Sequence, residues 1–109
     1  PAVKIIAVEP KNVSALLGHE PGLHQIQGIG DGFIPDILDV SLIDSIIEVT
    51  DDDAIATTRE LALTNSLLCG TSSGANIWAA RQTAKQHPEW VIATVLPDRA
   101  ERYFSTGLL

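Results

Sequence analysis

The sequence is poor in several residue types, and each shortage excludes a class of protein. Its 109 residues include no Met, one Cys, and seven Lys and Arg against fourteen Asp and Glu. A single cysteine excludes an internal disulfide and the paired cysteines of a zinc finger. The net charge of −7, with the few basic residues scattered, disfavours nucleic acid because phosphate binding needs clustered Lys and Arg. We therefore expect small molecules or proteins as partners, and no nucleic acid.

Long apolar runs are also missing from the sequence. No apolar stretch approaches the roughly 20 residues that a membrane-spanning helix needs. The N-terminus lacks the basic and then apolar pattern of a signal peptide. These features predict a cytoplasmic protein with no membrane partner. Because Met is absent, the chain either lost its initiator before Pro1 or begins inside a longer protein, and both alternatives stay open.

The apolar residues, 45% of the chain, suffice for one core of modest size and occur in short runs that alternate with helical patterns. Buried strands of the parallel type are predicted at residues 3–8, 45–50, 67–69 and 91–96. Helices are predicted at 52–65 and 75–86, with a short helix at 12–17 and a long loop at 18–36. This alternation indicates right-handed βαβ units. The expected fold class is therefore α/β, with a mostly parallel sheet flanked by helices.

An acidic triplet, Asp51-Asp52-Asp53, opens the first long helix. Asp caps a helix N-terminus well, and carboxylates in the first turn face the positive end of the helix dipole. The triplet lacks the D-x-[DN]-x-[DN]-G spacing of a calcium loop. We interpret it as a helix cap.

Residues 70–74 (GTSSG) match the G-x-S-x-G nucleophile elbow. That elbow needs an acid and then a histidine downstream, so that imidazole can take the serine proton. The histidine after Ser72 is His87, which ends the very next helix and precedes every plausible acid from Glu89 onward. We interpret Ser72 or Ser73 as the cap of a helix beginning near Gly74, and esterase activity as the lesser alternative.

Residues 28–33 (GIGDGF) resemble a dinucleotide-binding fingerprint but carry Phe33 where the last glycine is required. Their glycines indicate either a simple turn or the close approach of another group to the backbone, and both alternatives stay open. The Walker A pattern fails because no Lys follows Gly74, and His19, His24 and His87 lack the spacing of metal ligands. No metal site is expected. Cys69, beside two leucines, is expected to be a buried thiol.

Four segments carry a family resemblance in a fixed order. They are VEP at 8–10, HQIQGIGDGFIPDILD at 24–39, CGTSSGA at 69–75 and LPDRAERYFSTGLL at 96–109. With them the chain resembles the C-terminal part of cysteine synthases (O-acetylserine sulfhydrylases), pyridoxal-phosphate enzymes of the tryptophan-synthase-β type, fold type II. The resemblance implies that residues 1–109 form the C-terminal segment of the larger of two α/β domains. The small domain, the lysine segment and the phosphate loop would lie upstream, outside this chain.

The resemblance implies that the parent protein is a homodimeric enzyme that makes L-cysteine from O-acetylserine and sulfide by β-replacement. None of Lys4, Lys11 and Lys85 falls in a family lysine motif, so we expect no catalytic residue in this chain and no activity from it alone. One alternative is a relative of cystathionine β-synthase, which uses homocysteine. Another is a non-catalytic interaction domain, because the family's cleft also receives the C-terminal peptide of serine acetyltransferase.

The glycine-rich segment matches the part of the family that lines the cofactor. The resemblance implies that Gly28, Ile29 and Gly30 line pyridoxal phosphate and that Gln27 and Gly28 line the substrate. Side chains at the glycines would collide with the ring or the incoming substrate.

The resemblance to the family fails at one position. After Leu96-Pro97 a serine or threonine is expected to meet the pyridine nitrogen, whereas this chain has Asp98. We predict that Asp98 takes this role. The alternative is a surface ion pair of Asp98 with Arg99 or Arg102.

Overall fold

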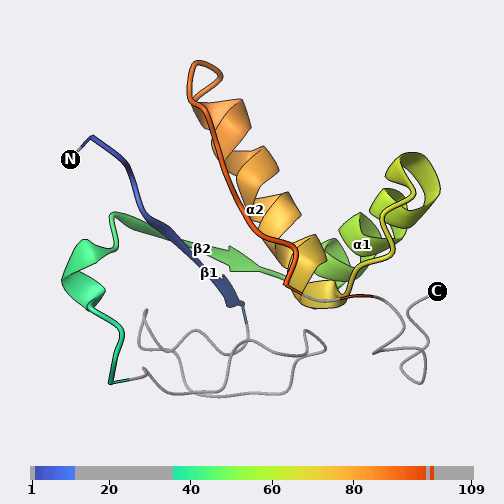
Figure 1. The fold of residues 1–109 in the computed structure, drawn as a ribbon, viewed down its shortest axis with the longest axis horizontal. Coiled ribbons are helices and arrows are strands. Elements are labelled where there is room, and N and C mark those ends of the chain that lie inside the picture. Colours follow the sequence, from blue (N-terminus) through green and yellow to red (C-terminus); the bar gives the residue numbers. More distant parts are fainter. Residues whose placement is uncertain (1, 12–35, 98, 100–109) are drawn as a thin grey trace.

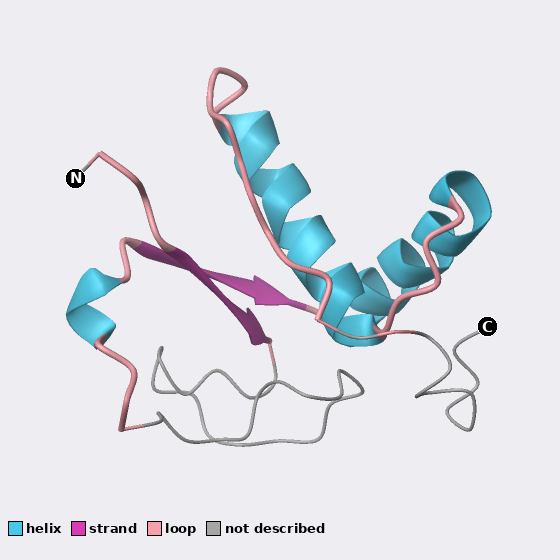
Figure 2. Ribbon diagram, in the orientation of Figure 1, coloured by secondary structure: helices cyan, strands magenta, loops and turns pink. Residues whose placement is uncertain are grey.

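A computed structural model describes residues 2–11, 36–97 and 99, and the account of the fold concerns these residues (Figure 1). Strand β1 (Ile6–Pro10) and strand β2 (Ser45–Val49) form a parallel sheet, and the 3-10 helix η2 (Val40–Leu42) leads into β2. Helix α1 (Asp51–Asn65) and helix α2 (Thr71–Gln86) follow (Figure 2). The predicted helix at 12–17 and most of the predicted loop at 18–36 lie outside the described residues.

The first two predicted strands are confirmed, as is their parallel pairing. The register places Ile6 opposite Ser45 and Pro10 opposite Val49. Strand β1 begins three residues later than the apolar run predicts, and Val3 remains 72% exposed. Pro10 ends the strand, where its missing N–H costs little.

The two later strands are a wrong prediction within the described residues. Residues 91–97 carry no strand, and in the segment 67–69 only Cys69 bridges, as an isolated antiparallel pair with Arg99. A β-branched run forms a strand only when another backbone supplies its hydrogen bonds. Val91 is 102% exposed and Val95 is 71% exposed. The segment 91–96 therefore has the residue types of a strand but is not packed like one.

Helix α1 matches its prediction, but its cap does not. Thr50 is the N-cap, and its Oγ1 accepts a hydrogen bond of 3.1 Å from the Asp53 N–H. The three aspartates instead fill the first turn, where their charges favour the positive helix end. Ser66 closes the helix in the left-handed conformation, with φ of 55°.

Helix α2 begins four residues before its predicted start at Ala75. Its N-cap is Gly70, which has extended backbone angles and no side-chain cap bond, so the capping role predicted for Ser72 or Ser73 is wrong. Both serines already belong to the first helical turn, and they are 2% and 0% exposed. An N-cap must precede the helical backbone, which excludes them.

The core lies where α1 and α2 pack on the sheet, and it is built from Val49, Ala54, Ala75 and Ala79. Gly74 of α2 packs directly against α1. A Cβ there would lie 1.9 Å from Thr58 Oγ1 and 2.4 Å from the Ala54 carbonyl oxygen. The glycine is therefore required by helix packing.

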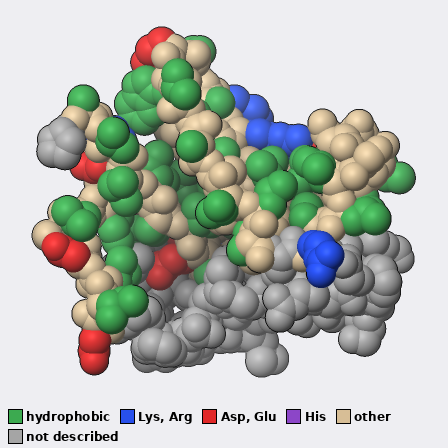
Figure 3. Space-filling model, in the orientation of Figure 1, with side chains coloured by type: hydrophobic (Ala, Val, Ile, Leu, Met, Phe, Trp, Pro, Cys, Tyr) green, Lys and Arg blue, Asp and Glu red, His purple; other side chains and the backbone are tan. Residues whose placement is uncertain are grey.

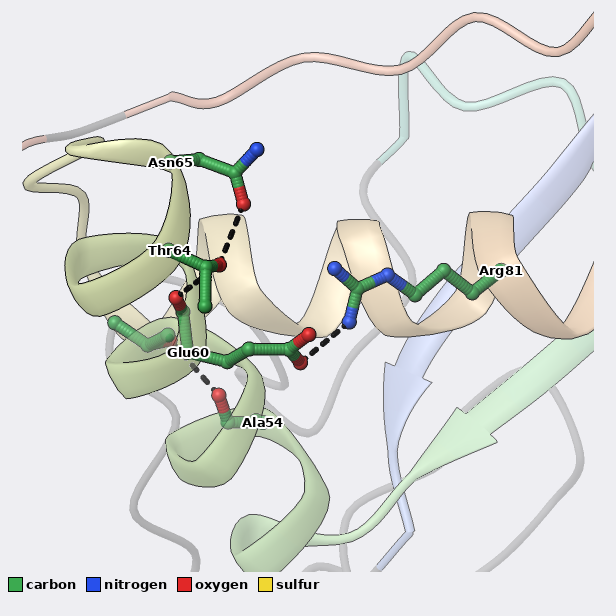
Figure 4. A network of polar contacts seen from close by, with 6 residues as sticks. Ala54, Glu60, Thr64, Asn65 and Arg81 are labelled. Carbon is green, nitrogen blue, oxygen red and sulfur yellow. Dashed lines mark hydrogen bonds and ion pairs between the residues drawn. The ribbon is translucent and has the colours of Figure 1, made fainter.

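Polar contacts surround this helix pair. Thr58 Oγ1 donates to the Ala54 carbonyl at 2.8 Å and lies 3.3 Å from the Gly70 carbonyl oxygen. Farther out, Arg81 of α2 pairs with Glu60 of α1 at 2.6 Å (Figure 4). Both side chains of the pair are more than 40% exposed, so solvent screens it and its contribution is small.

Candidate functional site

The carboxyl ends of both strands and the N-termini of both helices meet at one edge of the molecule (Figure 1). Pro10 and Val49 end their strands side by side, and the Lys11 N–H donates to the Val49 carbonyl at 2.9 Å. Strand β2 passes through Thr50 directly into α1. Ligands of parallel α/β sheets bind beyond the carboxyl ends of the strands, so this edge is the candidate site.

The turn at residues 70–74 brings one unusual group to this edge. Thr71, the first residue of α2, is 4% exposed, and its Oγ1 is buried without a hydrogen-bond partner in the described part of the chain. A buried hydroxyl without a partner costs about 1–3 kcal/mol. The N–H groups at a helix N-terminus also suit an acceptor or an anion. A polar group of a bound cofactor would satisfy this hydroxyl, so the turn fits such a group.

Sequence reasoning missed Thr71. Nothing in its local pattern distinguishes it from an ordinary first-turn residue.

The geometry of α2 does not support a serine nucleophile. Ser72 is 2% exposed and lies in a regular helical turn. His87 caps the opposite end of α2, about 22 Å away at 1.5 Å per residue. Its ring stacks on Trp90 with centroids 3.6 Å apart, in the turn after the helix. His87 therefore cannot take a proton from Ser72.

The residues predicted to line the cofactor and substrate, Gln27, Gly28, Ile29, Gly30 and Asp98, lie outside the described residues. Their roles stay predictions. The bridge between Cys69 and Arg99 places Arg99 beside the residue that precedes Gly70, the N-cap of α2. Arg99 therefore lies near the start of α2, at the candidate edge.

The described residues also bear on a reactive thiol, a metal site and a membrane-spanning helix. Cys69 is 5% exposed, which confirms the predicted buried thiol. Across this part of the chain, no group of three or more His, Cys, Asp and Glu side chains could hold a metal ion. Its helices are also too short or too polar to cross a membrane.

Comparison with known proteins shows to which class of protein the chain belongs. The model of a family described as pyridoxal-phosphate dependent enzyme matches residues 1–98. The chain belongs to this family, whose members use pyridoxal phosphate.

Two curated relatives of the chain are cysteine synthases. The chain is 51% identical over 106 residues to cysteine synthase B of Campylobacter jejuni and 46% identical over 109 residues to the cysteine synthase of Staphylococcus aureus. These matches cover 97% and 99% of this chain but 35% of each relative. The chain thus spans about a third of the length of these curated relatives.

Solved structures that resemble the chain include a cysteine synthase and an O-acetylserine dependent cystathionine beta-synthase. The cysteine synthase of Entamoeba histolytica superposes with a TM-score of 0.93 at 42% identity, covering 97% of this chain and 32% of that one. An O-acetylserine dependent cystathionine beta-synthase of Helicobacter pylori gives a TM-score of 0.88 at 45% identity, covering 99% and 35%. The resemblance and the α/β fold of the type II enzymes are therefore confirmed.

Proposed function

We propose that this chain is a segment of a pyridoxal-phosphate-dependent cysteine synthase that makes L-cysteine from O-acetylserine and sulfide by β-replacement. The observation that carries the proposal is the 46–51% identity to cysteine synthases over nearly the whole chain. The chain needs the rest of such a polypeptide for activity, because it spans about a third of those relatives and none of its lysines lies in a family lysine motif. The complete enzyme would be a cytoplasmic homodimer, and the C-terminal peptide of serine acetyltransferase would be a further partner.

Pyridoxal phosphate, when bound, supplies the electron sink that lets acetate leave and sulfide add. The residues of this chain would bind the cofactor and the substrate and would keep water away from them. Backbone at Gly28, Ile29 and Gly30 would line the cofactor, and Gln27 with Gly28 would line the substrate. The Thr71 hydroxyl, which is buried and has no partner in the described structure, would bond a polar atom of the bound group. The buried turn around it would keep water away from that bond.

Asp98 would meet the pyridine nitrogen, and its carboxylate would favour the protonated ring by opposite-charge stabilisation. In a full-length enzyme, Asp98→Ser should then change the absorbance of the bound cofactor and lower transamination relative to elimination. Unchanged spectra with the cofactor still bound would instead support the surface ion pair with Arg99 or Arg102.

A second candidate activity has its own support. The Helicobacter pylori neighbour is an O-acetylserine dependent cystathionine beta-synthase, and its 45% identity to this chain lies within the 42–51% range of the cysteine synthases. The nucleophile of the parent enzyme would then be homocysteine.

Steady-state rates separate the two activities. A full-length polypeptide that contains this chain should be assayed with O-acetylserine and either sulfide or homocysteine. The proposal predicts a higher kcat/KM with sulfide. A higher value with homocysteine would replace it with the cystathionine-forming activity.

A further inference from the structure

Thr58 is a polar residue in the middle of α1, and it is 0% exposed. Its hydroxyl lies 2.8 Å from the Ala54 carbonyl oxygen of α1 and 3.3 Å from the carbonyl oxygen of Gly70, the N-cap of α2. A hydroxyl carries one proton, so the two carbonyls share it in a three-centre hydrogen bond. Thr58 therefore ties α1 to the N-cap of α2.

The Gly70 carbonyl also takes part in the first turn of α2. It accepts a hydrogen bond from the Gly74 N–H at 3.2 Å. Gly70 makes no side-chain cap bond, and glycine restricts its own backbone less than any other residue. The bond from Thr58 thus supplies a restraint that Gly70 itself lacks.

The same bond orients Thr71, the residue after the N-cap. A peptide unit is planar, so the direction of the Gly70 carbonyl fixes the direction of the Thr71 N–H. This N–H is one of the first four of α2, which have no partner within the helix. Thr71 also carries the buried hydroxyl that has no partner in the described structure. Thr58 therefore restrains two donors at the candidate edge without belonging to that edge.

The surface of the described residues shows why the direction of such donors matters. In the space-filling view, hydrophobic and uncharged groups predominate, and Lys and Arg side chains cover small parts of the face (Figure 3). The described part of this face offers hydrogen-bond donors rather than a cluster of positive charge. The strength of a hydrogen bond depends on its direction, so a bound polar group needs donors that are held in place.

We infer that Thr58 is a positioning residue of the cofactor site. Its hydroxyl holds the peptide between Gly70 and Thr71 so that the first turn of α2 faces a polar atom of pyridoxal phosphate when the cofactor is bound. Thr58 acts through this peptide and needs no contact of its own with the cofactor. The inference rests on the proposed function, because it requires the cofactor at the start of α2.

Two substitutions of Thr58 separate positioning from packing. Thr58→Val keeps the shape of the side chain and removes the hydroxyl, whereas Thr58→Ser keeps the hydroxyl and removes a methyl group. In a full-length polypeptide that contains this chain, Thr58→Val should weaken pyridoxal phosphate binding about tenfold in equilibrium dialysis and change the absorbance of the bound cofactor. Thr58→Ser should bind the cofactor within about twofold of the unsubstituted protein. A role in packing alone predicts the opposite order, and either that order or equal effects would overturn the inference.

Thr83→Val is the matched control. Thr83 is also buried, and its hydroxyl donates to the Ala79 carbonyl at 3.0 Å, within α2 itself. The substitution removes the same kind of bond at a distance from the start of α2, so it should change cofactor affinity by less than about twofold. A loss as large as that of Thr58→Val would overturn the inference. Thr58→Ala, which also lacks the hydroxyl, replaces Thr58→Val if that variant does not fold.

Hydrogen exchange in the cofactor-free full-length polypeptide tests the restraint without the cofactor. The Gly74 amide, which donates to the Gly70 carbonyl, should exchange about tenfold faster in Thr58→Val than in the unsubstituted protein. Unchanged exchange would overturn the inference. An unsubstituted polypeptide that binds no pyridoxal phosphate would contradict the proposed function as well, whereas unchanged cofactor affinity of Thr58→Val in a polypeptide that does bind it would overturn this inference alone.

Discussion

At the scale of single residues, helix packing explains why a glycine occupies position 74. Its position in a serine-glycine turn suggested catalysis, but the glycine lets α2 approach Thr58 and Ala54 of α1. Gly74→Ala should lower the free energy of unfolding by about 3 kcal/mol, because the added Cβ meets a backbone oxygen that cannot move aside cheaply. Urea denaturation of the 109-residue chain measures this change.

Ala84→Ser, at an exposed position on the same helix, is the control and should change stability by less than about 0.5 kcal/mol. Similar values for the two variants would show that the helices do not pack as closely as described.

Thr71 gives a second prediction at this scale, with opposite signs in two measurements. Thr71→Val keeps the shape of the side chain and removes a buried hydroxyl that has no partner in the described structure. The isolated chain should become more stable by about 1 kcal/mol, because the substitution removes a buried hydroxyl that lacks a partner among the described residues. In a full-length enzyme the same change should weaken pyridoxal phosphate binding about tenfold, measured by equilibrium dialysis. Loss of stability with unchanged cofactor affinity would assign the hydroxyl a structural partner instead.

At the scale of elements, the start of α1 depends on one side chain. Thr50 Oγ1 accepts the Asp53 N–H, which satisfies one of the unpaired donors of the first turn. Thr50→Ala should cost about 1 kcal/mol of unfolding free energy. Thr64→Ala, which removes an exposed hydroxyl bonded within the same helix, should cost less than about 0.5 kcal/mol. An equal cost for the two would mean that the aspartates cap the helix, as the sequence first suggested.

The elements differ in how far the sequence could predict them. Helices α1 and α2 follow from local signals, namely Thr50 with its acidic turn and the stop before Pro88. The start of α2 was placed late because a glycine N-cap leaves no side-chain signal. The strand predicted at 91–96 is absent from the described structure, because residue type alone does not supply the hydrogen bonds that a strand needs from a second backbone.

The residues of the candidate site also differ in how far the sequence could predict them. Motif resemblance assigned Gly28 and its neighbours to the cofactor, whereas no local pattern marks the buried hydroxyl of Thr71 or the contact between Gly74 and Thr58. The contact between Gly74 and Thr58 arises where two helices meet whose residues are distant in the sequence.

At the scale of the whole molecule, the lysines of this chain are expected to form no specific covalent link with pyridoxal phosphate. In the described structure Lys4 precedes β1, and Lys85 lies in the last turn of α2, away from the candidate edge. Lys11 follows β1 and is exposed. Borohydride reduction of the isolated chain with the cofactor, followed by peptide mass spectrometry, should find no stoichiometric label. A stoichiometric label on any one of these lysines would contradict this expectation.

The central claim is that this chain forms about a third of a cysteine synthase, and a chimaera tests it most directly. In the chimaera the chain replaces the 106-residue segment of Campylobacter jejuni cysteine synthase B with which it aligns. With O-acetylserine and sulfide, the chimaera should form cysteine within about tenfold of the rate of the parent Campylobacter jejuni enzyme. The 109-residue chain alone should form none. A chimaera that folds and binds pyridoxal phosphate but makes no cysteine would contradict the account.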